Sequence, residues 1–415
     1  MSLSHASSIL VYIRKLIRVI AARLPGLRSR SCPIENSPAK HYENVPDISF
    51  PIEGCIAEIK VNPLLLENAF AEMPADVLRK GETSVLETRY NYSAKVLDCA
   101  RVFSDGVTHI SVYNRSNTLR KEFSAHHRIP PPRVLKKKCT TVYTGTTLHL
   151  AAEITTLNGN LFHWLLDAMG RVLLLQEKLD QTLQIDRYLI PPNIGSYREC
   201  MVAMGIDEDK LIELPMGESV EFEKLVWIAN PCGYSSHIVP GWLIQAYRKQ
   251  FSQIISDGMT KSTRLYISRA DATARKFRNE DKLEAALKER GYQIVKLSEY
   301  GLVEKIRLFS EATEVVGMSG AGLVCLMFCR RGTRVIEMYP STFVNYNIAS
   351  ISYQLGHDHR PYVFPSNSLI SKVNSFSGKF EIDVEKFLEF HDSAGPLFVP
   401  VVCRAQILAF ALFLE

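Results

Sequence analysis

The feature that most constrains the fold is an alternation of short apolar strands and amphipathic helices in the second half of the chain. Runs rich in β-branched residues predict strands, and the segments between them repeat apolar residues at helical spacing. The expected strands are Thr263–Ile267, Gln293–Leu297, Glu314–Gly317 and Thr333–Tyr339, and the expected helices are Asn279–Arg290, Leu302–Ala312 and Ala321–Cys329. Strands separated by helices of this length form a parallel, doubly wound sheet, so the sequence predicts an α/β fold.

The length and composition indicate a packed protein with more than one domain. The chain has 415 residues, of which 46% are hydrophobic and 22% are charged. This composition excludes a disordered chain, and the length exceeds that of one ordinary compact domain. Changes in pattern predict a basic N-terminal arm with a linker, an N-terminal α/β domain, a C-terminal Rossmann-like domain and a tail. The expected ranges are residues 1–45, 46–240, 241–365 and 366–415.

Charge and cysteine content limit the partners and the location. The net charge of +5 suits an anionic ligand or membrane surface, but it is too small and too dispersed for a nucleic-acid-binding protein. Nine cysteines without C-x-x-C spacing indicate buried free thiols in a reducing compartment rather than disulfides or a zinc site. No apolar segment is long enough to cross a bilayer. The cysteines, the lack of a recognisable secretory signal and the basic N-terminal arm lead us to expect a cytoplasmic protein, at the membrane surface or free of it. The basic segment Ile9–Leu24 predicts either a helix on the membrane surface or an ordinary solvated helix.

A glycine-rich turn follows the third expected strand. Gly317-Met318-Ser319-Gly320-Ala321-Gly322 lies between this strand and a helix, at the carboxyl end of a parallel strand, where ligands bind. Glycines let main-chain N–H groups approach a phosphate, and the N-terminus of the following helix attracts one. The spacing is neither that of a dinucleotide-binding turn nor that of a Walker motif. Tight packing without a ligand is therefore the alternative.

Five cations lie around the end of the first expected strand, which should open on the same crevice as the glycine-rich turn. They are Arg264, Arg269, Arg275, Lys276 and Arg278. Guanidinium groups bind phosphate oxygens through paired hydrogen bonds, so these residues predict a diphosphate clamp, with a solvated loop as the alternative. Glu337, in the last expected strand, is expected either to accept hydrogen bonds from a ribose or to lie on the surface.

In the N-terminal domain, His163 and Asp167 stand four residues apart on an expected helix over residues 158–178. This spacing stacks the two side chains on one helical face. A carboxylate beside an imidazole orients the ring and raises its basicity, as a general base requires. The alternative is a histidine with a structural hydrogen bond beside Trp164.

Two clusters of potential metal ligands are present. Asp207-Glu208-Asp209 matches a D-x-D site but does not follow an apolar strand, so a helix-capping acidic loop is favoured. His357-Asp358-His359 has no third ligand nearby in the sequence. We therefore expect no metal site.

Together these residues resemble the family 61 glycosyltransferases over roughly residues 158–364. The resemblance rests on ordered blocks: Asn160–Asp167, Tyr266–Arg269, Arg275 with Arg278–Glu280, Gly317–Leu323, and Arg334–Tyr339. Two positions depart from the family pattern. Ser319 stands where the family usually has His, and Lys305 follows Glu304 where the family usually has Gln.

The resemblance implies a GT-B fold, in which two Rossmann-like domains face each other across a cleft. It also implies an inverting, metal-independent glycosyltransferase. The enzyme would transfer a sugar from a nucleotide-diphosphate donor, expected to be UDP-linked, to a glycan or glycolipid in surface-polysaccharide synthesis, without a further cofactor. His163 and Asp167 would be catalytic, and Asn160 and Trp164 would lie on the acceptor side. The donor would be bound by Arg269, Arg275, Asn279, Ser319, Gly320, Ala321, Gly322 and Glu337.

Two alternatives to this enzyme stay open at the level of sequence. The first alternative is a nucleotide- or glycan-binding protein that has lost its catalytic activity. It rests on Ser319, because a hydroxyl group in place of the imidazole of His carries no charge near the donor phosphates. A manganese-dependent GT-A enzyme would instead use Asp207 and Asp209.

Overall fold

The computed structural model describes most of residues 92–393, with breaks at 105–108, 127–140, 152–158, 233–237 and 367–378 and a few shorter ones, and four short strands before residue 90. The chain forms two compact units. The first comprises Met1–Phe50, Tyr92–Trp164 and Leu179–Ala229, and the second comprises Pro51–Asn91, Leu165–Lys178 and Asn230–Glu415. The predicted N-terminal arm and most of the predicted tail lie outside the described residues.

The first unit is built on a mixed sheet in the order β10, β9, β8, β11, β5, β6, β7, with β1 beside β5. β10, β9, β8 and β11 run parallel, whereas β11, β5, β6 and β7 run antiparallel. The parallel pattern of a Rossmann-like domain is thus present in only part of this sheet. The strands are β1 Ile48–Phe50, β5 Tyr92–Ser104, β6 His109–Tyr113, β7 Ala125–His126, β8 Thr141–His149, β9 Arg187–Ile190, β10 Leu211–Glu213 and β11 Ser219–Ile228.

The next described helix after β8 runs without a break from residue 161 to residue 178, and its middle part is π-helical rather than α-helical. Its parts are α3 (Leu161–His163), the π-helical η3 (Trp164–Met169) and α4 (Gly170–Lys178). The compact units divide within this helix, so residues 165–178, which the sequence analysis placed in the N-terminal domain, belong to the second unit. The remaining helices of the first unit are α5 (Gly195–Ala203) and the 3₁₀ turn η4 (Glu208–Lys210). The predicted domain ranges themselves stay predictions.

The second unit contains a five-stranded parallel sheet, which confirms the α/β prediction for this part of the chain. Its order is β14, β12, β15, β16, β17, and all four neighbouring pairs are parallel. Numbered along the chain, the order is 2-1-3-4-5, which is that of a doubly wound sheet. The strands are β12 Thr263–Ile267, β14 Gln293–Val295, β15 Ala312–Met318, β16 Arg334–Pro340 and β17 Asp358–Phe364.

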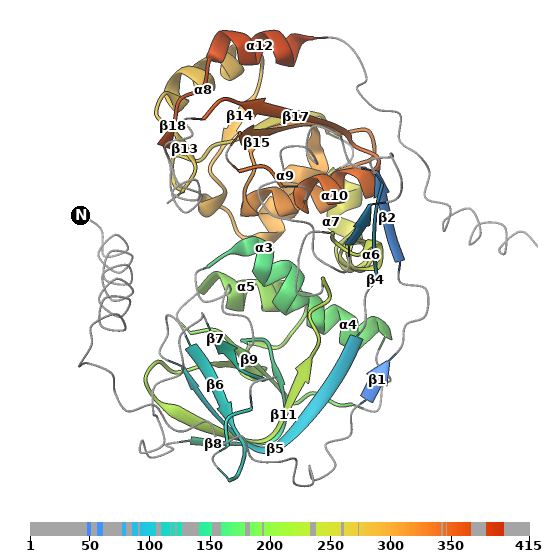
Figure 1. The fold of residues 1–415 in the computed structure, drawn as a ribbon, viewed down its shortest axis with the longest axis vertical. Coiled ribbons are helices and arrows are strands. Elements are labelled where there is room, and N and C mark those ends of the chain that lie inside the picture. The colour runs from blue at the N-terminus through green and yellow to red at the C-terminus, as the bar shows by residue number, and fades with distance from the viewer. Residues whose placement is uncertain are drawn as a thin grey trace, which may run out of the picture. The chain divides into compact units, whose positions relative to one another are not determined.

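Helices cover both faces of this sheet (Figure 1). On one face, Leu283 of α8 and Phe387 of α12 share a core with Ile336 and Met338 of β16. On the other face, α9 and α10 both pack against η6, while α6 packs against η6 and α7 packs against α9. These helices are α6 Gly241–Gln250, α7 Ser252–Gly258, α8 Glu280–Glu289, α9 Leu302–Glu311, the 3₁₀ helix η6 Ala321–Phe328, α10 Asn347–Leu355 and α12 Val384–Asp392; a 3₁₀ turn, η5, spans Leu297–Glu299.

Two small sheets complete the second unit. One is antiparallel and contains β2 (Ile56–Lys60), β4 (Val85–Arg89) and β3 (Val77–Arg79). The other pairs β13 (Lys276–Phe277) with β18 (Lys379–Phe380). Across the described residues of both units, no helix has the length and apolar content needed to cross a bilayer.

Two elements of the second unit differ from the prediction. The segment after the glycine-rich turn, Ala321–Phe328, is a 3₁₀ helix rather than an α-helix, and Gly322 within it has a low α-helix propensity. The strand β17 was not predicted, because Pro361 stands in the middle of it. Proline is tolerated there because β17 is an edge strand of the sheet.

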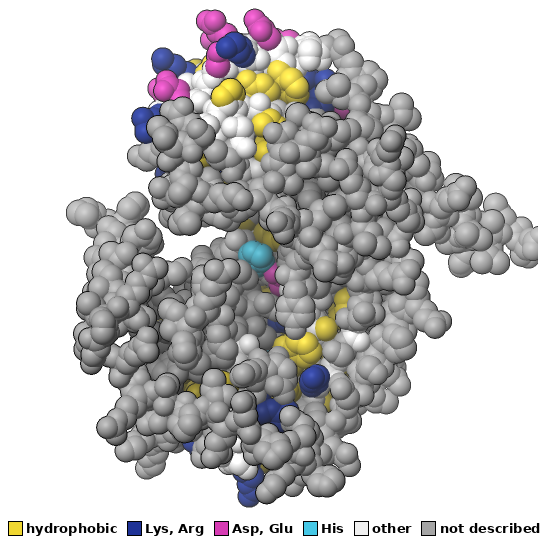
Figure 2. Space-filling view, viewed as in Figure 1, with side chains coloured by type: hydrophobic (Ala, Val, Ile, Leu, Met, Phe, Trp, Pro, Cys, Tyr) yellow, Lys and Arg dark blue, Asp and Glu magenta, His cyan; other side chains and the backbone are white. Residues whose placement is uncertain are grey.

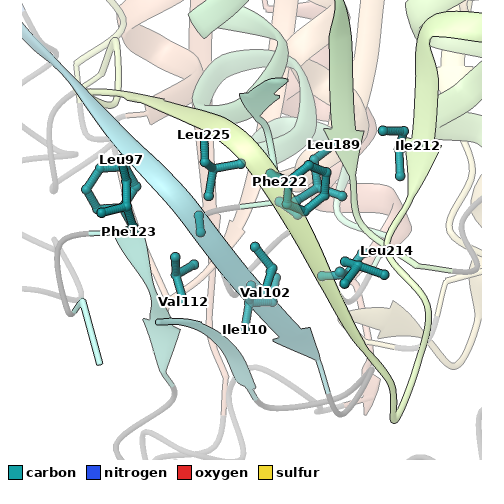
Figure 3. Close-up of a cluster of buried hydrophobic side chains, with 13 residues drawn as sticks. Leu97, Val102, Ile110, Val112, Phe123, Leu189, Ile212, Leu214, Phe222 and Leu225 are labelled. Carbon is teal, nitrogen blue, oxygen red and sulfur yellow. The ribbon is translucent and has the colours of Figure 1, made fainter. Parts of the chain in front are cut away.

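The buried core of the first unit, shown in Figure 3, allows the packing of the mixed sheet to be tested by mutation. Phe222 of β11 is 1% exposed and packs in one cluster with side chains of β5 and β9. We expect Phe222→Ala to lower the free energy of unfolding by about 3–5 kcal/mol, because truncating a buried aromatic side chain leaves a cavity. Val142→Ala, on the exposed side of β8, is the matched control and should cost less than about 1 kcal/mol. Urea unfolding followed by circular dichroism measures both; equal losses would contradict the assigned core.

Candidate functional site

The strand order reverses between β12 and β15, and this position defines the candidate site. The chain passes from β12 to β14 on one side and then to β15 on the other side of β12. In doubly wound sheets, ligands bind at such a reversal, outside the carboxyl ends of the strands. Arg269 follows β12 by two residues, and Ser319-Gly320 follows β15 directly. We call this end of the sheet the carboxyl edge.

Arg269 is fixed there by main-chain groups and by Gly320. Its Nε donates to Arg275 O at 2.8 Å, and its Nη2 donates to Ala274 O at 2.6 Å. Its own main-chain N–H donates to Glu280 Oε1 at 2.7 Å. A Cβ added at Gly320 would overlap with Arg269 Nη1. The guanidinium group therefore lies in contact with the glycine-rich turn, and only glycine leaves room for it.

Arg275 lies beside it in an unusual backbone conformation. Its φ is +50°, in the left-handed region that residues other than glycine rarely adopt. Residues held in such strained conformations cluster at functional sites. Its Nε donates to Ser319 O at 3.1 Å. Its guanidinium carbon lies 4.7 Å from the ring centre of Phe343, a favourable cation–π distance. Arg275 therefore links the loop after β12 to the loop after β15.

The two guanidinium groups, which we call the arginine pair, carry like charges in a partly buried place. Burial, together with the charge of Arg269, lowers the pKa of Arg275 to about 10. Burial also lowers the pKa of Arg269, although the charge of Glu280 opposes this effect. Neither forms an ion pair within the part of the chain that the structure describes, since both donate to neutral carbonyl groups. Such a place favours an anion, which would neutralise both charges.

The glycine-rich turn adds main-chain donors, with one correction to the prediction. The N–H of Ser319 donates to Met338 O at 2.9 Å and so extends the sheet rather than facing a ligand. The first hydrogen bond of η6 runs from Leu323 N to Gly320 O, so the N–H groups of Ala321 and Gly322 have no acceptor within the helix. A Cβ at Gly322 would overlap with Leu297. Gly322 is thus required for packing as well as for any approach of a ligand.

Two residues predicted to bind the donor are engaged elsewhere. Asn279 donates through Nδ2 to Ile382 O at 2.7 Å and accepts from Ile382 N at 3.1 Å. Glu337 is fully buried, with Oε2 at 2.9 Å from His359 Nε2. His359 Nδ1 in turn lies 3.3 Å from the hydroxyl of Tyr353. The structure therefore does not bring these two side chains to the arginine pair, and a donor contact for either one stays a prediction.

Sequence reasoning missed Glu280 and Phe343, which support the arginine pair. Glu280 is 7% exposed and also accepts a hydrogen bond from the hydroxyl of Tyr266 at 3.0 Å. It belonged to a block that resembles the family, but was assigned no role. Phe343 lies in the loop after β16, and no sequence pattern marks it.

The predicted catalytic residues lie on the helix after β8. Asn160 caps this helix, since its Oδ1 accepts from the main-chain N–H groups of Phe162 at 3.1 Å and His163 at 3.4 Å. His163 is half-buried and ends α3, whereas Asp167 is 2% exposed within the π-helical η3. The prediction assumed an uninterrupted α-helix. A π-helical turn alters the spacing of the side chains, and such turns are frequent at functional sites.

The neighbours of these residues are partly structural. Trp164 is fully buried and stacks on Tyr197, with ring centres 3.9 Å apart. An acceptor contact for Trp164 or for the capping Asn160 therefore stays a prediction.

Burial, together with the charge of Asp167, raises the pKa of the Cys232 thiol. Cys232 is one of five free cysteines among the described residues, and four of the five are buried.

Several side chains of the two clusters of potential metal ligands form ion pairs or hydrogen bonds with other residues, and Asp358 and His359 do so with Arg360 and Glu337. Asp207 pairs with Lys210 at 2.9 Å, and Glu208 lies 3.7 Å from Arg198. This acidic triplet precedes β10 rather than following a strand. Burial lowers the pKa of His357 to about 3. No group of three or more His, Cys, Asp or Glu side chains is placed to hold a metal ion in the described chain.

Comparison with known proteins indicates a family. Residues 161–336 match the model of the family described as glycosyltransferase 61. Over these residues the chain is similar to glycosyltransferase family 61. The match runs from the start of α3 into β16, so it includes His163, the arginine pair and the glycine-rich turn. No curated protein matches the chain.

The match supports a glycosyltransferase, an enzyme that uses a sugar donor and an acceptor. Asn160 and Glu337 fall just outside the matched residues. The arginine pair and the free N–H groups of the glycine-rich turn lie inside them and share the carboxyl edge. They are therefore the part of the described chain best suited to an anionic donor.

The contact between Gly320 and Arg269 generates a prediction. Gly320→Ala should displace the guanidinium group of Arg269, because the new Cβ overlaps with its Nη1. We expect pyrophosphate to bind about tenfold more weakly, measured by isothermal titration calorimetry, since one charge-assisted hydrogen bond is lost. The unfolding temperature should change little, because the displaced atom is the end of a flexible side chain.

A double-mutant cycle provides the control for this prediction. In the Arg269→Ala background the clash no longer exists, so Gly320→Ala should have almost no further effect on binding. Two effects that simply add would show that the glycine and the arginine act independently.

Proposed function

We propose that the protein transfers a sugar from a nucleotide-diphosphate donor to a glycan or glycolipid acceptor, with inversion at the anomeric carbon. The observation that carries this proposal is the arginine pair, two guanidinium groups that lack a carboxylate partner in the described chain and stand at the strand reversal. A diphosphate supplies the negative charge that these groups lack. The proposed donor is UDP-linked, and no further cofactor or metal is proposed.

In this mechanism the arginine pair acts on the leaving group. When the bond between the sugar and the diphosphate breaks, its electron pair goes to the diphosphate oxygen, which gains negative charge. Arg269 and Arg275, with the N–H groups of Ala321 and Gly322, would stabilise that charge without rearranging, since they are already held by their neighbours. Because main-chain carbonyl groups hold both guanidinium groups, the donors are oriented before the substrate arrives.

The acceptor side of the mechanism is proposed for the helix after β8. His163 would remove the proton from the acceptor hydroxyl as that oxygen attacks the anomeric carbon from the face opposite the diphosphate. This single displacement inverts the configuration. Asp167, one turn further along the helix, would orient the imidazole and stabilise its protonated form. The proposed GT-B arrangement, with two domains facing across a cleft, would bring donor and acceptor together.

The donor half of the proposal predicts the behaviour of Arg269→Ala. We expect this variant to bind the nucleotide-diphosphate donor more weakly by about 2 kcal/mol, because one charge-assisted pair is lost. Arg278→Ala is the matched control, since Arg278 belongs to the same run of cations but is exposed, and it should bind almost normally. Titration calorimetry with a panel of nucleotide sugars measures both. Donor binding that is unchanged in Arg269→Ala would refute the assigned donor site.

The acceptor half predicts the behaviour of His163→Ala. This variant should retain nucleotide binding while transfer, or donor hydrolysis in the absence of an acceptor, falls about 100-fold, because the general base is missing. Gln176→Ala, at an exposed position of α4 on the same helix, should keep full activity. If His163→Ala loses nucleotide binding while Arg269→Ala keeps it, the roles of the two sites are reversed.

The second candidate function is that of a nucleotide- or glycan-binding protein without turnover. Ser319, buried at 2% exposure, favours it, because it stands where the family resemblance implies a His. Saturable nucleotide binding with no hydrolysis of any donor in the same panel would support this candidate over the enzyme.

We further propose that the enzyme works in surface-polysaccharide synthesis in the cytoplasm, at the membrane surface. The support for this is the basic composition of residues 9–24 in the sequence, which suits contact with anionic lipid.

A further inference from the structure

A second concentration of arginines lies at the opposite end of the parallel sheet. Arg264 is near the start of β12, Arg334 starts β16, Arg360 is near the start of β17, and Arg290 follows α8. These four residues line a hollow of ≈ 380 Å³, together with His391, Asp392 and Ser393. We call it the amino-edge cavity. Arg264 and Arg269 are five residues apart along one strand and its loop, or roughly 17 Å, so this cavity is separate from the arginine pair.

The pairing of β15 with its two neighbours assembles the centre of this cavity. Glu314 of β15 is in register with Arg264 of β12 and with Arg334 of β16. Its Oε1 lies 2.9 Å from Arg334 Nη1 and its Oε2 lies 3.2 Å from Arg264 Nε, so the carboxylate forms an ion pair with each arginine. Burial alone would raise the pKa of Glu314, but hydrogen bonds from His391 and Tyr292 and the charge of Arg334 lower it. Glu314 is therefore ionised and neutralises one of the two arginines.

The other two arginines are each paired with one carboxylate. Arg290 Nη2 lies 2.9 Å from Asp392 Oδ2, and Arg360 Nη2 lies 2.8 Å from Asp358 Oδ2. Four guanidinium groups thus share three carboxylates, which leaves one positive charge in excess before His391 is considered. Charged side chains of both signs gather over α8 and α12 (Figure 2), and Asp392 of this network is the last residue of α12.

Hydrogen-bond donors are also left over at the cavity. Arg334 Nε is buried and has no hydrogen-bond partner among the described residues. The side chain of Arg264 is 49% exposed. Its Nε pairs with Glu314 and its Nη1 donates to Arg290 O, whereas its Nη2 has no partner in the described chain. A buried donor without an acceptor is unfavourable, and an oxyanion in the cavity that reaches these guanidinium groups beside Glu314 would provide the acceptor.

We propose that the amino-edge cavity binds an oxyanion, either a phosphate or a carboxylate group, carried by a small polar molecule. Planar guanidinium groups match both kinds of oxyanion through paired hydrogen bonds. The volume exceeds that of an inorganic anion and lies within the range of small-molecule sites. The lining contains only charged and polar side chains, so the rest of the ligand is polar, as a phosphorylated or acidic sugar is. This site does not depend on the proposed function.

The test measures binding of labelled inorganic phosphate and of labelled glucuronate by equilibrium dialysis. All proteins carry Arg269→Ala, so that an anion held by the arginine pair does not contribute. Arg264→Gln should weaken binding of the preferred oxyanion at least tenfold. The matched control, Lys282→Gln, removes one exposed charge from α8 outside the cavity and should bind normally. Whichever of the two anions binds more tightly identifies the ligand group as phosphate or carboxylate.

Two further measurements keep the proposal falsifiable. Circular dichroism establishes that each variant is folded, and Arg290→Gln replaces Arg264→Gln if the latter is not. Crystals of the unsubstituted chain soaked in tungstate should show an anomalous peak in the amino-edge cavity, close to Arg264 and Arg334. Absence of that peak, or binding of both anions that is equal in the cavity variant and the control, would overturn the proposal.

Discussion

Two positive charges held close together by neutral carbonyl groups are the constraint on which the carboxyl edge depends. A carboxylate partner would have satisfied Arg269 and Arg275 and left nothing for a ligand. Instead, Ala274 O, Arg275 O and Ser319 O orient the guanidinium groups without cancelling their charge. Three local features accompany this arrangement. Gly320 lacks the Cβ that would overlap with Arg269 Nη1, Arg275 has a positive φ, and Glu280 accepts a hydrogen bond from the main-chain N–H of Arg269.

The carboxyl edge could be predicted from sequence because its parts come from the ends of successive strands. β-branched runs marked β12, β15 and β16, and parallel strands necessarily bring their carboxyl ends to one edge. The loops at Arg269 and Ser319 were therefore expected to meet, and Arg275 Nε and Ser319 O do so. Local departures from regular structure could not be predicted. Neither the π-helical η3 nor the 3₁₀ form of η6 has a distinct apolar periodicity in so short a segment.

The direction in which individual side chains point could not be predicted from the sequence either. The pattern placed Glu337 at the end of the last expected strand, whereas it lies in the middle of β16; in addition, neighbouring residues of a strand point to opposite faces. Ile336 and Met338 face α8 and α12, whereas Glu337 bonds to His359 on the adjacent strand. The amino-edge cavity escaped prediction for a related reason. Its residues come from strand starts and helix ends that are far apart in the chain, and only the strand register brings Glu314 between Arg264 and Arg334.

Pro361 affects the tendency of this chain to associate with other copies of itself through the edges of the parallel sheet. An edge strand with a full row of N–H and C=O groups can recruit a strand from another molecule and so begin an aggregate. β17 forms one edge of the parallel sheet in the described chain, and Pro361 in its middle offers no N–H group. The other edge, β14, has only three residues. An incoming strand would find an interrupted row of partners on one side and a very short one on the other, so neither edge favours self-association.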